Sequence, residues 1–219
     1  MAVRSVANNA PIRPVVKRVF TLDMLRSLVR YWPMYTALLL LGFFGFYRLS
    51  TLVPPNGRSF DRSRYLTHGD IVWGNPGAHI ITTCSKAMQK SGQMQVVQVP
   101  KLQDRLICPV RALRAIVSKH KNQEDKPLFT NSLGQVIPAY RMRLELKGAI
   151  RVMGWATEGL GYHTLRRSGA SWAFDHGINL DHLKAHGGWR SDAVWKYLIK
   201  TPSAAAKVAH TFKAHIKYP

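Results

Sequence analysis

Residues 186–197, near the end of the chain, read HGGWRSDAVWKY. The Gly187-Gly188 pair predicts a tight corner between two helices, because glycine ends helices and turns the chain. Trp189 follows this corner directly, and Tyr197 lies within the next helical segment. On their own, these aromatic residues are more typical of a packed core than of a functional site.

A second basic stretch, residues 162–167, reads YHTLRR. If it opens a helix, His163 and Arg166 are three residues apart and share one face. The positive end of the helix dipole adds to their charge, and a guanidinium group binds two phosphate oxygens at once. The stretch therefore fits a phosphate-binding site, and it fits equally well a solvated helix start with a packed histidine.

Together the two stretches resemble the C-terminal part of the tyrosine recombinases, the phage-integrase-type enzymes that exchange DNA strands. His163, Arg166, Trp189 and Tyr197 stand in the order and spacing of that family. The run GGWRSDA is most similar to recombinases of eukaryotic mobile elements of the Crypton and DIRS-like kinds. The resemblance extends over roughly residues 18–200.

Two upstream segments carry the rest of the resemblance. Residues 45–52, GFYRLSTL, are similar to the first arginine box of the family, an apolar helix that ends in the first catalytic arginine, here Arg48. Residues 81–89, ITTCSKAMQ, resemble its lysine-bearing strand hairpin, with Lys86 as the matching lysine. Thr51 departs from the pattern, because members commonly carry an acidic residue there.

The resemblance implies a reaction in which Tyr197 attacks phosphorus and forms a covalent 3′-phosphotyrosine. The two arginines would bind the non-bridging oxygens, and Lys86 would protonate the leaving 5′-oxygen. Breakage and rejoining would then need neither ATP nor a metal, so we expect no cofactor. The implied catalytic residues are Arg48, Lys86, His163, Arg166, Trp189 and Tyr197.

The fold class that we predict is mostly α with a small antiparallel β-sheet (α+β), as in the catalytic domain of this family. We expect a basic flexible segment at 1–20, one catalytic domain at 21–200 and a basic tail at 201–219. Hydropathy and Gly/Pro signals predict helices at 21–30, 33–47, 109–117, 138–153, 163–174, 180–185 and 191–200, and strands at 71–73, 79–83 and 94–99.

The charge of the chain points to a polyanionic partner. Its 219 residues include 32 Lys and Arg but only 11 Asp and Glu, which gives a formal net charge of +21. We therefore expect double-stranded DNA as the partner, and self-association as a tetramer on paired DNA sites is implied by the resemblance. A DNA substrate and a eukaryotic element would place the protein in the nucleus.

Several other classes fit the sequence less well. The apolar run 31–47 is shorter than the ~20 residues of a membrane span and contains Pro33. His182 and His186 are spaced to share a metal on a helix, but no third ligand stands out. The two cysteines, Cys84 and Cys108, give no disulfide framework.

Two further interpretations remain open at the level of sequence. Thr51 and the short segment before the catalytic part are consistent with a host-adopted DNA-binding protein that has lost strand exchange. A type IB topoisomerase shares similar catalytic logic, although the Gly-Gly-Trp corner favours a recombinase.

Overall fold

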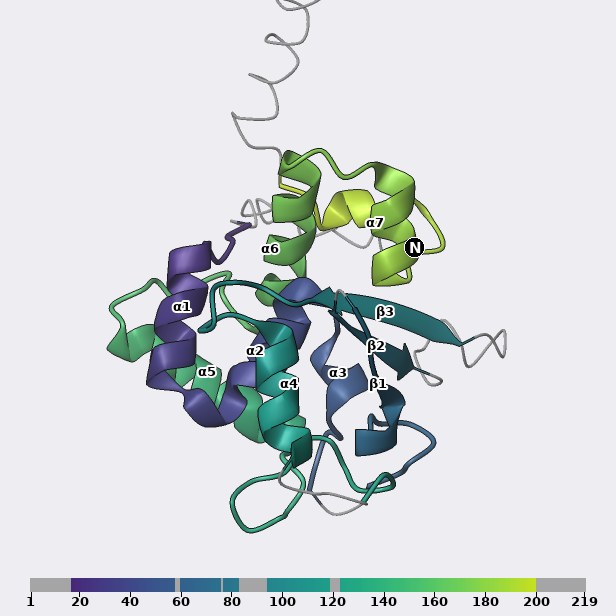
Figure 1. Cartoon of the computed structure of the whole chain (residues 1–219). Coiled ribbons are helices and arrows are strands. Elements are labelled where there is room, and N and C mark those ends of the chain that lie inside the picture. Colours follow the sequence, from purple (N-terminus) through teal and green to yellow (C-terminus); the bar gives the residue numbers. More distant parts are fainter. Residues whose placement is uncertain (1–16, 58–59, 76, 83–93, 119–122, 200–219) are drawn as a thin grey trace, which may run out of the picture.

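The most apolar helix of the chain, α2 (Thr36–Phe44), is buried on all sides and organises the fold. The computed structural model describes residues 17–57, 60–75, 77–82, 94–118 and 123–199 (Figure 1). Helix α2 packs against α1 (Leu22–Tyr31), α4 (Pro109–Val117) and α6 (Tyr162–Asp175). Its leucines, Leu38 to Leu41, have no exposed surface, so α2 is the centre of the larger core.

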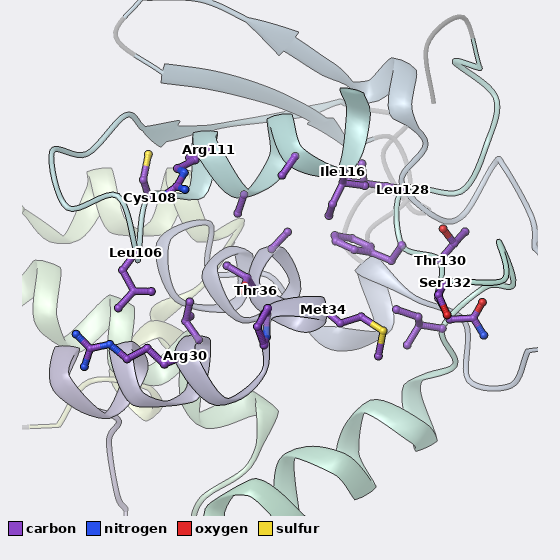
Figure 2. A pocket seen from close by; sticks show the side chains of 18 of the residues that line it. Arg30, Met34, Thr36, Leu106, Cys108, Arg111, Ile116, Leu128, Thr130 and Ser132 are labelled. Atoms are coloured by element: carbon purple, nitrogen blue, oxygen red, sulfur yellow. The ribbon is translucent and has the colours of Figure 1, made fainter. Parts of the chain in front are cut away.

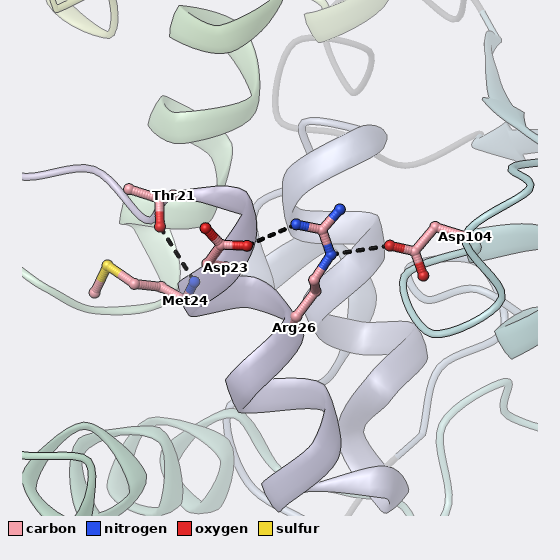
Figure 3. A network of polar contacts seen from close by, with 5 residues as sticks. All are labelled: Thr21, Asp23, Met24, Arg26 and Asp104. Carbon is pink, nitrogen blue, oxygen red and sulfur yellow. Dashed lines mark hydrogen bonds and ion pairs between the residues drawn. The ribbon is translucent and has the colours of Figure 1, made fainter.

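Helix α1 begins where the sequence predicts. The Thr21 hydroxyl accepts a hydrogen bond from the Met24 amide (3.2 Å) and so caps the first turn. Further along α1, Arg26 donates to Asp23 (2.7 Å) and to Asp104 (2.9 Å), which lies in the loop before α4 (Figure 3). The Arg26 guanidinium also holds the pKa of the Asp104 carboxyl below its usual range.

A three-stranded antiparallel sheet covers one side of the helices. It has the order β1 (Ile71–Trp73), β2 (Gly77–Thr82) and β3 (Gln95–Pro100). Ile71 pairs with Ile80, and Ile80 pairs with Val97, which places these three buried side chains on one face. The predicted α+β class and antiparallel sheet are confirmed.

The remaining helices complete the described part of the chain. They are α3 (Leu49–Leu52), α5 (Ala139–Val152), α7 (Leu180–Gly187) and the 3-10 helices η1 (Pro33–Tyr35), η2 (His68–Asp70) and η4 (Asp192–Lys196). A second, smaller core under α6, α7 and η4 contains Phe46, Leu183 and Trp189. Across the described ranges, every helix is too short or too polar to cross a bilayer.

Two predicted helices were wrong in extent. The single helix expected over 33–47 is a 3-10 turn followed by α2, which ends at Phe44. Phe46 then takes a left-handed conformation (φ 51°), so the chain turns before Arg48. The helix expected over 191–200 is the short 3-10 helix η4, because Ser171 of α6 accepts from the Ile199 amide (3.0 Å) and draws the chain away from a helical path.

Candidate active site

The first turn of α6 is fixed by contacts on both sides of its N-terminus. The Thr164 hydroxyl accepts from the Gly161 amide (3.0 Å) and donates to the Gly159 carbonyl (3.0 Å). The Tyr162 hydroxyl donates to the Leu38 carbonyl of α2 within the core. This anchoring sets the direction of the helix that carries His163 and Arg166.

Arg166 is buried, and its guanidinium is held by two backbone carbonyls. It donates to the Phe46 carbonyl and to the Gly187 carbonyl (2.8 Å), so it joins the turn after α2 to the end of α7. Its Cζ lies 4.0 Å from the centroid of the Trp189 ring, a cation–π contact. Burial lowers the pKa of Arg166, and the nearby charge of Arg48 lowers it further. An arginine nevertheless stays protonated near neutral pH.

The corner after α7 places Trp189 against Arg166. Gly188 has a φ of +65°, a conformation that favours glycine, and it ends the helix. A Cβ on Gly187 would overlap the Trp189 ring, so the glycine allows the indole to fold back over the helix end. The Trp189 Nε1–H is buried and has no hydrogen-bond partner among the described residues.

Tyr197 lies at the end of η4 and faces the same residues. Its ring centroid lies 5.0 Å from that of Trp189 and 5.0 Å from that of His163. The Arg166 Cζ lies 5.2 Å from the Tyr197 centroid. The Ser171 hydroxyl donates to the Tyr197 carbonyl (3.3 Å), which ties this segment to α6. The structure thus gathers a phenol, an imidazole, an indole and a guanidinium around one point.

His163 differs from Arg166 because it remains accessible to solvent. Burial of part of its ring lowers its pKa, and the charges of Arg166, Arg167 and Arg48 lower it further. A neutral imidazole is therefore favoured at neutral pH, and a neutral imidazole both donates and accepts hydrogen bonds.

Arg48 stands at the N-cap position of α3 instead of at the end of the apolar helix that the sequence predicts. It lines a small polar hollow together with Thr51, Gln95 and Arg166. The Thr51 amide donates to the Arg48 carbonyl (3.0 Å), so Thr51 helps to form the turn that presents this arginine. Lys86, the lysine that the resemblance implies, lies outside the described residues, as does the nearby Lys90.

Sequence reasoning missed three residues that shape the site. Phe46 supplies a carbonyl to Arg166, and its ring packs on His186 (4.7 Å between centroids) and Trp189 (6.0 Å). Gln95 donates to the His186 carbonyl (2.8 Å) and so links β3 to the corner. Of the three, only Ser171 could have been found from the sequence, because a serine on the buried face of a helix requires a hydrogen-bond partner.

His186, one of the two histidines considered for metal binding, instead forms a hydrogen bond to a backbone carbonyl. His186 Nε2 lies 2.8 Å from the Phe44 carbonyl, so this nitrogen carries the proton and donates. No cluster of three or more potential metal ligands occurs among the residues described. Of the two cysteines, Cys108 is buried with a free thiol, and Cys84 lies outside the described ranges.

Solved structures with the same arrangement of elements identify the fold. XerA recombinase matches with a TM-score of 0.63 over 93% of this chain and 68% of its own, at 14% identity. XerH site-specific recombinase bound to its difH substrate matches with a TM-score of 0.59 over 86% and 50%, at 16% identity. This chain has the tyrosine recombinase catalytic fold.

A lambda integrase dimer bound to a core site is also similar, with a TM-score of 0.58 at 15% identity over 83% of this chain and 47% of that one. The chain spans about half to two thirds of the length of the first such recombinases that it matches. No protein-family model and no curated protein matches the sequence.

Proposed function

We propose that this chain is the catalytic domain of a DNA strand-exchange enzyme that cuts and rejoins double-stranded DNA through a 3′-phosphotyrosine. The observation that carries the proposal is the convergence of His163, Trp189 and Tyr197 on the buried Arg166. The similar XerH and lambda integrase structures are bound to DNA. The formal charge of +21 suits the same partner.

The chemistry follows from the charge that develops on phosphorus. The Tyr197 hydroxyl oxygen attacks phosphorus and forms the P–O bond to the protein, its proton passes to His163 or to solvent, and the P–O5′ bond breaks. Arg48 and Arg166 stabilise the added charge on the non-bridging oxygens, because they are already in place before the reaction. The Trp189 Nε1–H is a further donor for a phosphate oxygen, and His163 donates or accepts a proton beside it.

The leaving 5′-oxygen takes up a proton, for which Lys86 is the proposed acid. Attack of a 5′-hydroxyl on the phosphotyrosine then reverses these steps and joins the DNA. The free energy of the cleaved bond is kept in the covalent link, so the reaction as written consumes no nucleotide and uses no cofactor.

The experiment that tests this proposal traps the covalent intermediate. Purified protein is mixed with a pool of nicked duplexes of randomised sequence, in which the cleaved fragment diffuses away and prevents rejoining. We expect protein–DNA adducts that survive denaturing electrophoresis. Tyr197→Phe should abolish them, whereas Tyr140→Phe, which removes an exposed hydroxyl on α5, should leave them unchanged.

Other outcomes of the trapping experiment would contradict the proposal or favour another function. Adducts that persist in Tyr197→Phe would refute the assignment of the nucleophile. Salt-dependent duplex binding without any adduct would instead identify a DNA-binding protein that has lost strand exchange. Relaxation of supercoiled DNA without a paired site would favour a type IB topoisomerase.

The finer assignments are further parts of the proposal. The GGWRSDA run supports an origin in a Crypton or DIRS-like mobile element, and such an element would place the enzyme in the nucleus. Assembly as a tetramer on paired sites would account for exchange between two duplexes. Sedimentation of the protein with and without the trapped duplex tests the tetramer.

A further inference from the structure

An elongated groove of about 810 Å³ lies between α1, the start of α2, α4 and the segment 128–137 (Figure 2). It shares no lining residue with the hollow around Arg166 and Arg48. The strand-exchange chemistry proposed above makes no use of it.

The floor and walls of this groove are mostly apolar, with Thr36, Thr130, Asn131 and Ser132 as polar residues of the lining. Val29, Ala37, Leu106, Ile116 and Leu128 line it. Met34 extends along its edge with 52% of its surface exposed, so a flexible apolar side chain stands open to solvent. Exposed apolar surface of this kind marks sites of interaction, and a groove between helices suits the apolar face of another helix.

The rim of the groove is basic. Arg30, Arg105 and Arg111 line it and are exposed, and no Asp or Glu is among the lining residues. None of the ion pairs formed between described residues includes these arginines. Arg111 donates to the Arg105 carbonyl (3.0 Å). A carbonyl is neutral, so neither guanidinium charge is neutralised by this contact.

We propose that the groove binds an acidic amphipathic helix of a partner protein. The apolar face of such a helix covers Met34 and Ile116, while its carboxylates pair with the arginines at the rim. Charge complementarity of this kind selects the partner and speeds its association.

The same charge argues against occupants from this chain. All 11 acidic residues lie within the described ranges, so residues 1–16 and 200–219 contain no Asp or Glu. A basic tail would be repelled by the three arginines, and a second copy carries a formal charge of +21. DNA would satisfy the arginines, but a phosphate backbone leaves the apolar floor unused.

Selection from a displayed library of random peptides tests the proposal with the full chain. We expect enrichment of sequences with apolar residues at helical spacing and Asp or Glu between them. Their binding, measured by fluorescence anisotropy, should weaken at least about tenfold in Ala115→Trp, which fills the groove from an exposed position on α4. The combined Arg30→Glu and Arg111→Glu variant should weaken it by about as much.

Matched controls separate this site from others. Arg143→Glu reverses an exposed charge on α5, outside the groove, and should leave peptide affinity unchanged. Unchanged thermal unfolding of each variant shows that it is folded. Enriched peptides that lack acidic residues, or that bind Ala115→Trp as tightly as the parent protein, would overturn the proposal. If no peptide is enriched and the double charge reversal weakens duplex binding, the arginines serve DNA instead.

Discussion

Alanine at Gly169 should disrupt the close contact at which α6 crosses α2. A Cβ at this position would overlap the Phe43 carbonyl oxygen and lie 2.8 Å from the carbonyl carbon and 2.9 Å from Phe46 Cε1. Carbon atoms in contact lie about 3.5–4.0 Å apart, so the two helices would have to separate by roughly 1 Å. Gly148 offers a matched control, because it also lies within a helix and a Cβ there meets nothing within 4 Å.

The two substitutions should shift stability in opposite directions. Each gains about 1 kcal/mol from the higher helix propensity of alanine. At Gly148 this gain stands alone, so the free energy of unfolding should rise by about 1 kcal/mol. At Gly169 the separation of two backbones outweighs it, and overpacking of this severity costs about 3 kcal/mol or more.

Thermal unfolding followed by circular dichroism measures both effects. For a chain of this length, 1 kcal/mol corresponds to about 2–4 °C in Tm, so Gly148→Ala should gain that much. Gly169→Ala, with a net loss of about 2 kcal/mol or more, should lose at least about 4 °C. Equal Tm values for the two variants, or a Gly169→Ala protein as stable as its parent, would contradict this prediction. Either result would mean that α2 and α6 do not approach as closely as the structure places them.

Ser171→Ala should lower the free energy of unfolding by about 1–3 kcal/mol in urea titrations, because the Tyr197 carbonyl and the Ile199 amide lose their partner. Covalent adducts should also form more slowly, and unchanged stability with an unchanged rate would contradict this role. Stability should fall as the pH drops below about 6.5, because burial lowers the pKa of His186 in the folded state and the unfolded chain then binds the proton more readily. The lowered pKa of His163 likewise makes the folded state less stable as the pH falls. His186→Gln should therefore reduce the slope of the free energy of unfolding against pH. Each group contributes at most about 1.4 kcal/mol per pH unit to that slope, and an unaltered slope would argue against this role of His186.

The elements that the sequence predicted well are those whose limits are set by local chemistry. Thr21 caps α1, Pro109 opens α4, and Gly188 ends α7, and each acts through its own backbone or a neighbour along the chain. The alternation of buried and exposed residues in β3 likewise follows from the period of a strand. These signals need no knowledge of the rest of the fold.

The two wrong helix limits depend on contacts between distant residues. The turn at Phe46 is stabilised by Arg166, which binds the Phe46 carbonyl from α6. The end of η4 is fixed by Ser171 in the same helix. Helical periodicity describes a single segment and contains no information about either partner.

The residues of the candidate site likewise fall into two groups, those that could be predicted from the sequence and those that could not. His163, Trp189 and Tyr197 were predicted from the resemblance of their segments to the tyrosine recombinases, and the structure brings their rings together. The groups that orient them act through backbone carbonyls or amide side chains, as Phe46 and Gln95 do. Any residue type has a carbonyl, so the sequence gives no indication of this role.

The surroundings of Arg166 relate its part in the stability of the fold to its part in the proposed binding of phosphate. Burying a guanidinium is costly unless its donors are satisfied, and here two neutral carbonyls accept from its terminal nitrogens, whereas its buried Nε–H has no partner among the described residues. Among the ion pairs of the described residues none includes Arg166 or Arg48, so their positive charge is not cancelled by a carboxylate. Burial is the main cause of the lowered pKa of Arg166, and the like charge of Arg48 lowers it further, so the two guanidinium groups disfavour each other. A phosphate anion between them would convert that repulsion into two attractions, which is what the proposed binding of DNA requires.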